Sequence, residues 1–240
     1  MKKHLLLTLA VVLFSFTLYA QGGRQSSVYY DGSSYGFRWS WGKEAGEAHW
    51  SGLGFAFSNW NGLEDADLIL NRSYSVVLNL FDYTVPLHRH WLGVTGLGFD
   101  WSRYHFKGDI GLREEDRVTQ FLPDSEGRKY RDSKFLAYYA TVPILLEYQT
   151  TFGEKTVFIA GGIEGMLNLY SKSQVEIRTP DGIKKKHYKD LNVLPVNYRF
   201  ATFIGVNSFT LFGYYQPNSP FQKGKGPDVQ PYGMGLLLSF

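Results

Sequence analysis

From about residue 49 onward, hydrophobic and polar side chains alternate along the chain with a period of two. In residues 49–60, for example, the large apolar residues Leu53, Phe55 and Phe57 take the odd positions, and small residues take the even ones. Successive side chains of a β-strand point to opposite faces of the sheet, so this alternation predicts strands with one apolar face. The pattern predicts eight strands, at residues 49–60, 72–84, 91–106, 135–149, 157–170, 195–207, 209–216 and 230–240.

The connections between these strands alternate in length. The long ones are residues 61–71, 107–134, 171–194 and 217–229, and the short ones are 85–90, 150–156 and Asn207-Ser208. Outer-membrane β-barrels have short periplasmic turns and long outer loops, so this order is typical of them. Within 171–194, Thr179-Pro180-Asp181-Gly182 predicts a turn, and we expect a hairpin that extends above the membrane.

The predicted fold is an all-β, closed, antiparallel transmembrane β-barrel of eight strands. The sheet has to close because lipid offers no partner for the unpaired backbone groups of an open edge. A soluble sandwich or lipocalin-like barrel is the alternative, but here the apolar faces are rich in aromatic residues and the opposite faces are small or polar. Pro143 lies inside strand 135–149 and cannot donate a ladder hydrogen bond, so we expect a bulge there.

The first 48 residues precede the barrel and divide into two segments. Lys2 and Lys3 lead into the apolar run 5–18, which ends at Tyr19-Ala20-Gln21 and predicts a signal peptide over residues 1–20. A membrane-anchor helix is the alternative. Residues 21–48 are expected to be a periplasmic lead-in segment, or a ninth strand that would demand a tenth. The barrel itself is predicted to span residues 49–240.

Composition supports export and narrows the functions. Aromatic residues make up 17% of the chain, and the mean hydropathy is only −0.23. That combination suits a barrel, in which every second side chain faces lipid. The net charge of +3 is too small to suggest nucleic-acid binding. Without cysteine the chain has neither disulfides nor thiolate metal ligands.

The last residues match the carboxyl-terminal assembly signal of outer-membrane barrels, in which a glycine precedes spaced hydrophobic residues and a terminal phenylalanine. Here these are Gly235, Leu238 and Phe240. We therefore expect insertion by the barrel-assembly machinery into the cell outer membrane.

Several strands resemble a known family. Residues 138–148, which include Pro143 and end in Glu147-Tyr148, are similar to the central strand motif of PorT-like outer-membrane β-barrels from Bacteroidetes. The strands at 157–162 and 232–240 have the same places as in that family, and 49–55 is similar to the first barrel strand of its relatives. The resemblance covers residues 49–240 and implies an outer-membrane barrel. Some members assist protein secretion, so it also implies an accessory role in secretion as an alternative function.

Four charged residues are expected to point into the barrel. They are Asp100, Glu147, Glu164 and Arg199. Buried charges are costly unless paired, and an eight-stranded barrel is only wide enough for its own side chains. We therefore predict an ion-pair and hydrogen-bond network that fills the lumen. The alternative is a lumen that conducts ions or binds a ligand.

No catalytic, metal or cofactor site is predicted. His105 and Ser102 have opposite parity on one strand, so their side chains face opposite sides of the sheet. His88 and His90 share parity, but no carboxylate is near them in sequence. No nucleophile elbow, phosphate-binding loop, zinc signature or dinucleotide motif is present. A lipid-modifying or proteolytic barrel and a narrow pore remain alternatives to a structural or interaction protein.

One loop carries a basic patch, formed by Lys184, Lys185, Lys186 and Lys189. Such a run is usually a solvated loop. The functional hypothesis is contact with lipopolysaccharide phosphates or with an acidic envelope protein, because lysine attracts phosphate as a point charge.

Overall fold

The computed structural model describes residues 27–30, 35–38, 46–63, 67–124, 126–179, 182–189 and 191–240. The predicted signal peptide, residues 1–20, and most of the lead-in segment lie outside the described residues. No helix among the described residues is long and apolar enough to cross a membrane.

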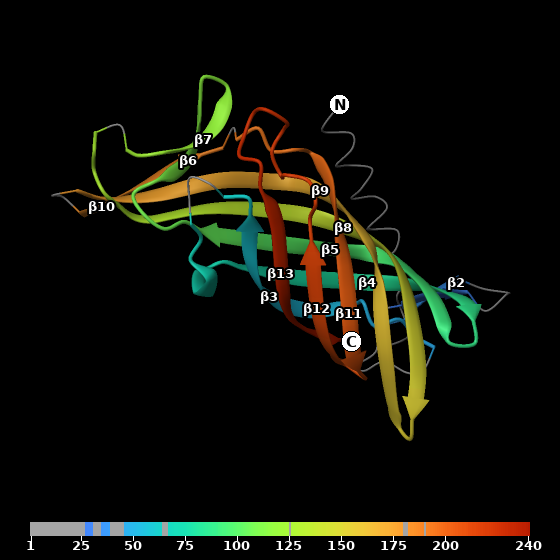
Figure 1. The fold of residues 1–240 in the computed structure, drawn as a ribbon. Helices are drawn as coiled ribbons and strands as arrows, with labels where there is room; N and C mark the ends of the chain where they lie inside the picture. The colour runs from blue at the N-terminus through green and yellow to red at the C-terminus, as the bar shows by residue number, and fades with distance from the viewer. Residues whose placement is uncertain are drawn as a thin grey trace.

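Eight antiparallel strands form a closed ring, which confirms the predicted fold class (Figure 1). Every strand of the ring pairs with its neighbour in sequence among these eight, and β13 returns to pair with β3, so no ring edge is left open. The strands are β3 (Gly52–Asn61), β4 (Tyr74–His88), β5 (Trp91–His105), β8 (Tyr130–Phe152), β9 (Lys155–Thr179), β11 (Val196–Val206), β12 (Phe209–Tyr215) and β13 (Gln230–Ser239).

Short turns gather at one end of the ring and long connections at the other. The β8–β9 turn begins with Gly153 at φ 61°, and the β11–β12 turn begins with Asn207 at φ 51°. Glycine and asparagine tolerate this left-handed backbone, which explains why such short turns form here. The predicted alternation of connection lengths is therefore confirmed. We call the two ends the turn end and the loop end.

The neighbouring strands β8 and β9 run well past the ring at the loop end, and we call the part beyond the ring the extension. The upper part of β9 pairs with β10 (Gly182–Tyr188), and this hairpin extends to the left in Figure 1. The predicted hairpin within 171–194 is thus confirmed, although Pro180 and Asp181 of its turn lie outside the described residues. A second hairpin, β6 (Gly111–Glu115) with β7 (Val118–Leu122), packs on the β8–β9 extension. The sequence predicted 107–134 only as a long connection, without this hairpin.

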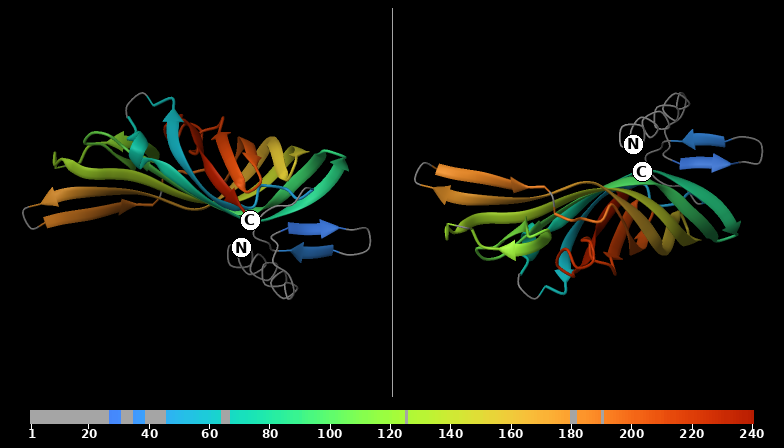
Figure 2. Two further views of the ribbon diagram at one scale, coloured as in Figure 1. Left: turned by 90° about the horizontal axis from the view of Figure 1, so that it is seen from below. Right: turned by 90° about the horizontal axis from the view of Figure 1, so that it is seen from above.

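A hairpin formed by β1 (Ser27–Tyr30) and β2 (Tyr35–Arg38) lies outside the ring (Figure 2). Its only ladder with the ring, among the described residues, is a two-residue parallel pairing of β1 with β4. The ring therefore has eight strands rather than ten, and part of the 21–48 segment is a hairpin beside it.

The prediction of a bulge at Pro143 is wrong. Pro143 stays in register opposite Glu164, and the register shifts lie elsewhere, in two ladders. The β4–β5 ladder has them at Asn79/Phe81 and Pro86/His88, and the β8–β9 ladder at Tyr130/Asp132 and Tyr138/Tyr139. The missing N–H of proline removes a hydrogen bond, but it does not oblige the chain to insert an extra residue. Pairing with β9 on the other side holds β8 in register.

Inside the ring, apolar side chains form two separate clusters. The cluster near the turn end includes Trp50, Leu92, Phe158, Phe203 and Leu237. The cluster near the loop end combines strand residues with residues of the long connections, including Trp60, Phe135, Leu191, Phe221 and Val229. Most charged lumen groups are concentrated between the two clusters.

Candidate functional site

A short segment before the first ring strand runs inside the barrel. β3 begins at Gly52, and the preceding residues Ala48, His49, Trp50 and Ser51 are all buried. The sequence pattern placed His49 and Trp50 at the start of a strand, because alternation alone cannot distinguish a strand from a chain that folds into its own barrel. We call residues 46–51 the inner segment.

The Trp50 side chain fills the middle of the lumen and is held from several strands. Its indole Nε1 donates a hydrogen bond of 2.8 Å to Glu164 of β9. A Cβ atom at Gly96 or Gly98 of β5 would lie about 3 Å or less from the indole ring, at 2.8 Å and 3.0 Å respectively. These two glycines therefore make room for the tryptophan. Asn79 of β4 donates to the Trp50 carbonyl at 2.8 Å and fixes the backbone.

His49 is bound to Glu147 toward the turn end. The His49 Nδ1 and Glu147 Oε1 atoms are 2.6 Å apart, and the His49 backbone N–H donates to the other carboxylate oxygen at 3.1 Å. Gln149 donates to Glu147 at 2.7 Å and to the Glu47 carbonyl at 2.6 Å. The imidazole stacks on Phe158 with ring centroids 3.9 Å apart. Glu147 is therefore an anchor for the inner segment, a role that alternation along its strand does not predict.

Asp100, Glu164 and Arg199 meet at the centre of the lumen. The Arg199 guanidinium donates to Asp100 at 2.5 Å and to Glu164 at 2.6 Å, and it lies over the Tyr214 ring at 4.4 Å. All three charged side chains are almost fully buried. Each carboxylate thus has a direct cationic partner, as a buried charge requires. Glu147 does not join this group, because it lies near the turn end with His49.

Three serines extend this polar layer across the ring. Ser102 donates to Asp100 at 2.7 Å, and Ser75 lies 2.9 Å from both Ser102 and Ser58. The Tyr214 hydroxyl is 2.6 Å from Ser58. The serines are buried and bonded to one another rather than to a histidine, so they cross-link strands and do not form a nucleophile with a base.

The loop basic patch is not one surface. Consecutive residues of β10 point to opposite faces, so Lys185 pairs with Glu176 at 3.0 Å on one face and Lys186 with Asp124 at 3.3 Å on the other. Lys184 and Lys189 are exposed. Two of the four lysines are thus already bound to carboxylates of this chain.

The predicted assembly-signal residues lie on and beside the strand that closes the ring. Leu238 points outward, whereas Gly235 packs so closely on β3 that a Cβ atom there would be 2.0 Å from the Phe55 carbonyl oxygen. Phe240 follows β13, and its backbone N–H reaches the Ser51 carbonyl at 3.4 Å. Their role in assembly stays a prediction.

The histidines considered in the sequence lie at opposite ends of the ring, with His88 and His90 at the turn end and His105 at the loop end. His105 is buried on the outward side of β5, where its Nδ1 is 2.7 Å from the Arg72 carbonyl. His90 Nδ1 is 3.0 Å from the Gln149 carbonyl. In the part of the chain that the structure describes, no group of three histidine, aspartate or glutamate side chains is placed to hold a metal ion.

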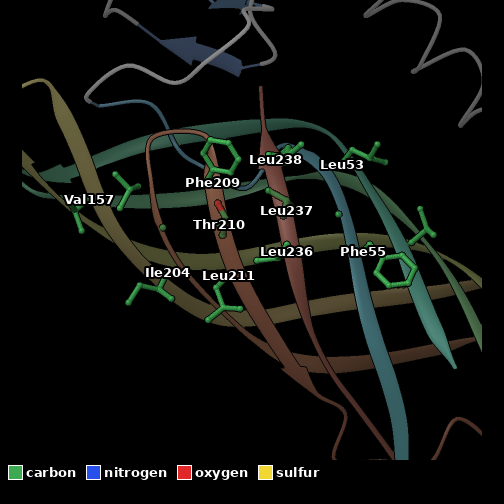
Figure 3. A pocket seen from close by; sticks show the side chains of 14 residues that line it. Leu53, Phe55, Val157, Ile204, Phe209, Thr210, Leu211, Leu236, Leu237 and Leu238 are labelled. Atoms are coloured by element: carbon green, nitrogen blue, oxygen red, sulfur yellow. The ribbon is translucent and has the colours of Figure 1, made fainter. Parts of the chain in front are cut away.

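The outside of the ring is almost entirely apolar. A groove of about 920 Å³ lies across its outer face, and the side chains labelled in Figure 3 line it from neighbouring strands. They include Leu53 and Phe55 of β3, Leu211 of β12 and Leu236 of β13. The ring therefore shows apolar side chains on its outside, whereas a soluble barrel shows polar ones, and its inside holds a charged and hydroxyl layer between two apolar clusters.

The chain is thus a closed, eight-stranded, antiparallel β-barrel with a filled lumen. Its sequence matches no protein-family model and no curated protein. Among solved structures it is similar to that of Ail, the attachment invasion locus protein of Yersinia pestis, at 12% sequence identity and a TM-score of 0.33. That similarity covers 79% of this chain and 99% of the Ail chain. It carries no information about function.

Proposed function

We propose that this chain is an outer-membrane β-barrel of structural or interaction type, without catalytic activity, whose long connections are its working surface. The observation that carries the proposal is the closed ring with apolar side chains outward on all eight strands. Such a surface is stable in hydrocarbon and unstable in water. Outer-membrane lipids, lipopolysaccharide and, during insertion, the barrel-assembly machinery would be its partners.

Aromatic side chains support this location because they lie near both ends of the outer surface. Tyr138 and Tyr170 stack near the loop end, and Trp91 packs on Tyr148 near the turn end. Between these levels β8 presents Val142 and Ile144 outward. Aromatic girdles at two levels with an aliphatic band between them are characteristic of membrane-spanning barrels.

A charge placed in the aliphatic band tests the proposal. Ile144 is 74% exposed in the middle of this band, and Ile183 is 47% exposed on β10 beyond the ring. In a membrane, Ile144→Arg should lower the free energy of unfolding by about 2–4 kcal/mol, whereas the matched control Ile183→Arg should change it little. Urea unfolding in phospholipid vesicles, followed by the heat-dependent shift in gel mobility, measures both. Equal and small effects of the two variants would contradict a membrane location.

A filled lumen also supports a structural role over a pore. From the turn end to the loop end, the lumen holds first the inner segment, then the ion-paired group of Asp100, Glu164 and Arg199, and then the loop-end apolar cluster. We therefore expect purified protein in planar bilayers to show no steady conductance in the nanosiemens range. Steady nanosiemens steps would overturn this part of the proposal and favour the pore.

A further inference from the structure

Outward side chains of four neighbouring strands form two level rows near the loop end. Strand register places Val76, Trp101, Tyr138 and Tyr170 side by side in the lower row. The row above it, two residues nearer the loops, is Tyr74, Arg103, Leu136 and Lys172. An aromatic row thus lies directly beneath a row that carries two cations, and this is the order expected where hydrocarbon meets lipid head groups.

Arg103 is held in place without a carboxylate partner. Its Nη1 donates to the Tyr74 hydroxyl at 3.2 Å, its Nη2 is 3.3 Å from His105 Nε2, and its guanidinium lies 5.7 Å from the Tyr74 ring centroid. Its Nε is buried and has no hydrogen-bond partner among the described residues. The side chain is therefore oriented, and among the described residues it forms no direct ion pair; Asp132 contacts the neighbouring His105 Nε2, at 3.5 Å, rather than Arg103.

The neighbouring cations outside these rows are different. Asp132 pairs with both Arg72 and Lys134, at 3.0 Å each, and Lys107 pairs with Asp67 at 3.5 Å. No carboxylate of the described residues forms an ion pair with Arg103 or with Lys172, which lies over the Tyr170 ring at 5.8 Å. The two cations that face outward at the aromatic level are thus the ones left for an external anion.

A groove next to Arg103 can hold an apolar chain. It has a volume of about 400 Å³ and is lined by Tyr74, Val76, Trp101, Arg103, Leu136 and Tyr138. The groove is open to the outside of the ring, with its charged group at the loop end and its apolar groups toward the middle of the barrel.

We propose that the groove residues and Lys172, which we together call the Arg103 patch, bind a phosphorylated glycolipid of the outer leaflet. The phosphate would lie on the Arg103 guanidinium, with Lys172 adding a second positive charge, and an acyl chain would lie along Val76, Trp101 and Tyr138. Guanidinium binds phosphate through two parallel hydrogen bonds, and loss of water at the interface strengthens that bond. The inference rests on the proposed membrane location, and it assigns lipid phosphate to this patch rather than to the lysines of β10.

Lipid retention after detergent exchange tests the proposal. Wild-type protein would first be shown to be folded by its heat-dependent gel shift, so that failure to fold or insert is recognised separately. It would then be mixed with purified lipid A in detergent micelles, and the retained lipid counted by native mass spectrometry. Arg103→Gln with Lys172→Gln should retain at least about tenfold less lipid A. The control Lys107→Gln with Lys185→Gln, which removes two carboxylate-paired cations, should retain as much as wild type.

Two further arms identify what is bound. Wild-type protein should retain dephosphorylated lipid A as poorly as the variant Arg103→Gln with Lys172→Gln retains lipid A. Inorganic phosphate at millimolar concentration should not displace lipid A from wild type. Arg103→Lys keeps the charge and loses the planar fork, so it should retain an intermediate amount. Equal retention by the Arg103 and control variants would overturn the proposal. So would retention independent of the lipid phosphates, or displacement by phosphate alone.

Discussion

At the centre of the lumen, Arg199 faces two carboxylates and the Tyr214 ring. These groups are almost fully buried, so their charges are compensated by one another and by hydrogen bonds from Trp50 and Ser102 rather than by water. Removing one member of such a group leaves the others buried and unpaired, which costs more than the pair itself contributes. Alternation correctly indicated that these side chains point inward, but which acid meets which base depends on the register of three strands.

Arg199→Met should therefore lower the free energy of unfolding by about 3–5 kcal/mol. The reason is that Asp100 and Glu164 would lose their cation while remaining buried. Urea unfolding in vesicles, monitored by gel mobility, measures the change. The triple variant Arg199→Met, Asp100→Asn, Glu164→Gln removes all three charges and should be less destabilised than the single one. If the triple variant is no better, charge pairing is not the cause.

Asp124, outside the ring, has a different relation to pH. Hydrogen bonds from Arg128, the Glu126 backbone and Lys186 hold the pKa of this carboxyl well below its usual range, although its burial acts in the opposite direction. A depressed folded pKa stabilises the loop above the unfolded value of about 3.9, and this stabilisation is lost as the pH falls below it.

The Asp124→Asn variant should show the consequence at neutral pH. Amide exchange at Glu126 and Gly127 should be faster than in wild type at pH 7. The difference should shrink as the pH falls below about 3.9, because Asp124 of the opened loop then takes up a proton while Asp124 of the folded loop stays ionised. Hydrogen–deuterium exchange of both proteins, compared at each pH, measures it. A difference that stays constant from pH 7 to pH 2.5 would show that the carboxylate charge is not involved.

Among the elements, the ring strands and the β9–β10 hairpin were predicted from the sequence, whereas the inner segment and the β6–β7 hairpin were not. The period of two located all eight strands, because each has one face toward the outside of the ring and one toward the lumen. The inner segment was missed because the predicted strand begins at residue 49, although Trp50 stands at an even position, where that strand has small residues. Only the space left by Gly96 and Gly98 shows where the Trp50 side chain goes. The β6–β7 hairpin was not predicted either, because its sequence has no clear period of two and it is stabilised by packing on β8 and β9.

Closure of the ring depends on close contact between β13 and β3. Gly235→Val should prevent that contact, because even a Cβ atom would be 2.0 Å from the Phe55 carbonyl oxygen. We expect a large loss of the folded, heat-shifted gel band in the refolded protein. Met234→Val changes the adjacent outward residue, which is 63% exposed, and should fold like wild type. Normal folding of Gly235→Val would show that the two strands can separate without opening the ring.

In the whole molecule, β8 and β9 belong both to the ring and to the extension beyond its loop end. Pairing between β5 and β8 ends at His105 and Lys134, and Lys134 lies opposite Gln174 of β9. Beyond that level β9 is part of the extension and no longer of the ring. There Val175 and Ile177 form a small apolar cluster with Tyr130. The ring should therefore fold without the extension, whereas the loop packed on the extension should not stay ordered.

Replacing residues 175–186 with Asn-Gly separates these two parts. Gln174 and His187 are paired neighbours, so a two-residue turn can join them without moving the rest of β9. The heat-dependent gel shift and the midpoint of urea unfolding should stay close to those of wild type. Trypsin should now cut at Arg113, Arg117 or Arg128, because the β6–β7 hairpin has lost Val175 and Ile177 and Asp124 has lost Lys186. Loss of the gel shift would instead mean that the extension is needed to close the ring, since ring pairs below Gln174 would then be insufficient.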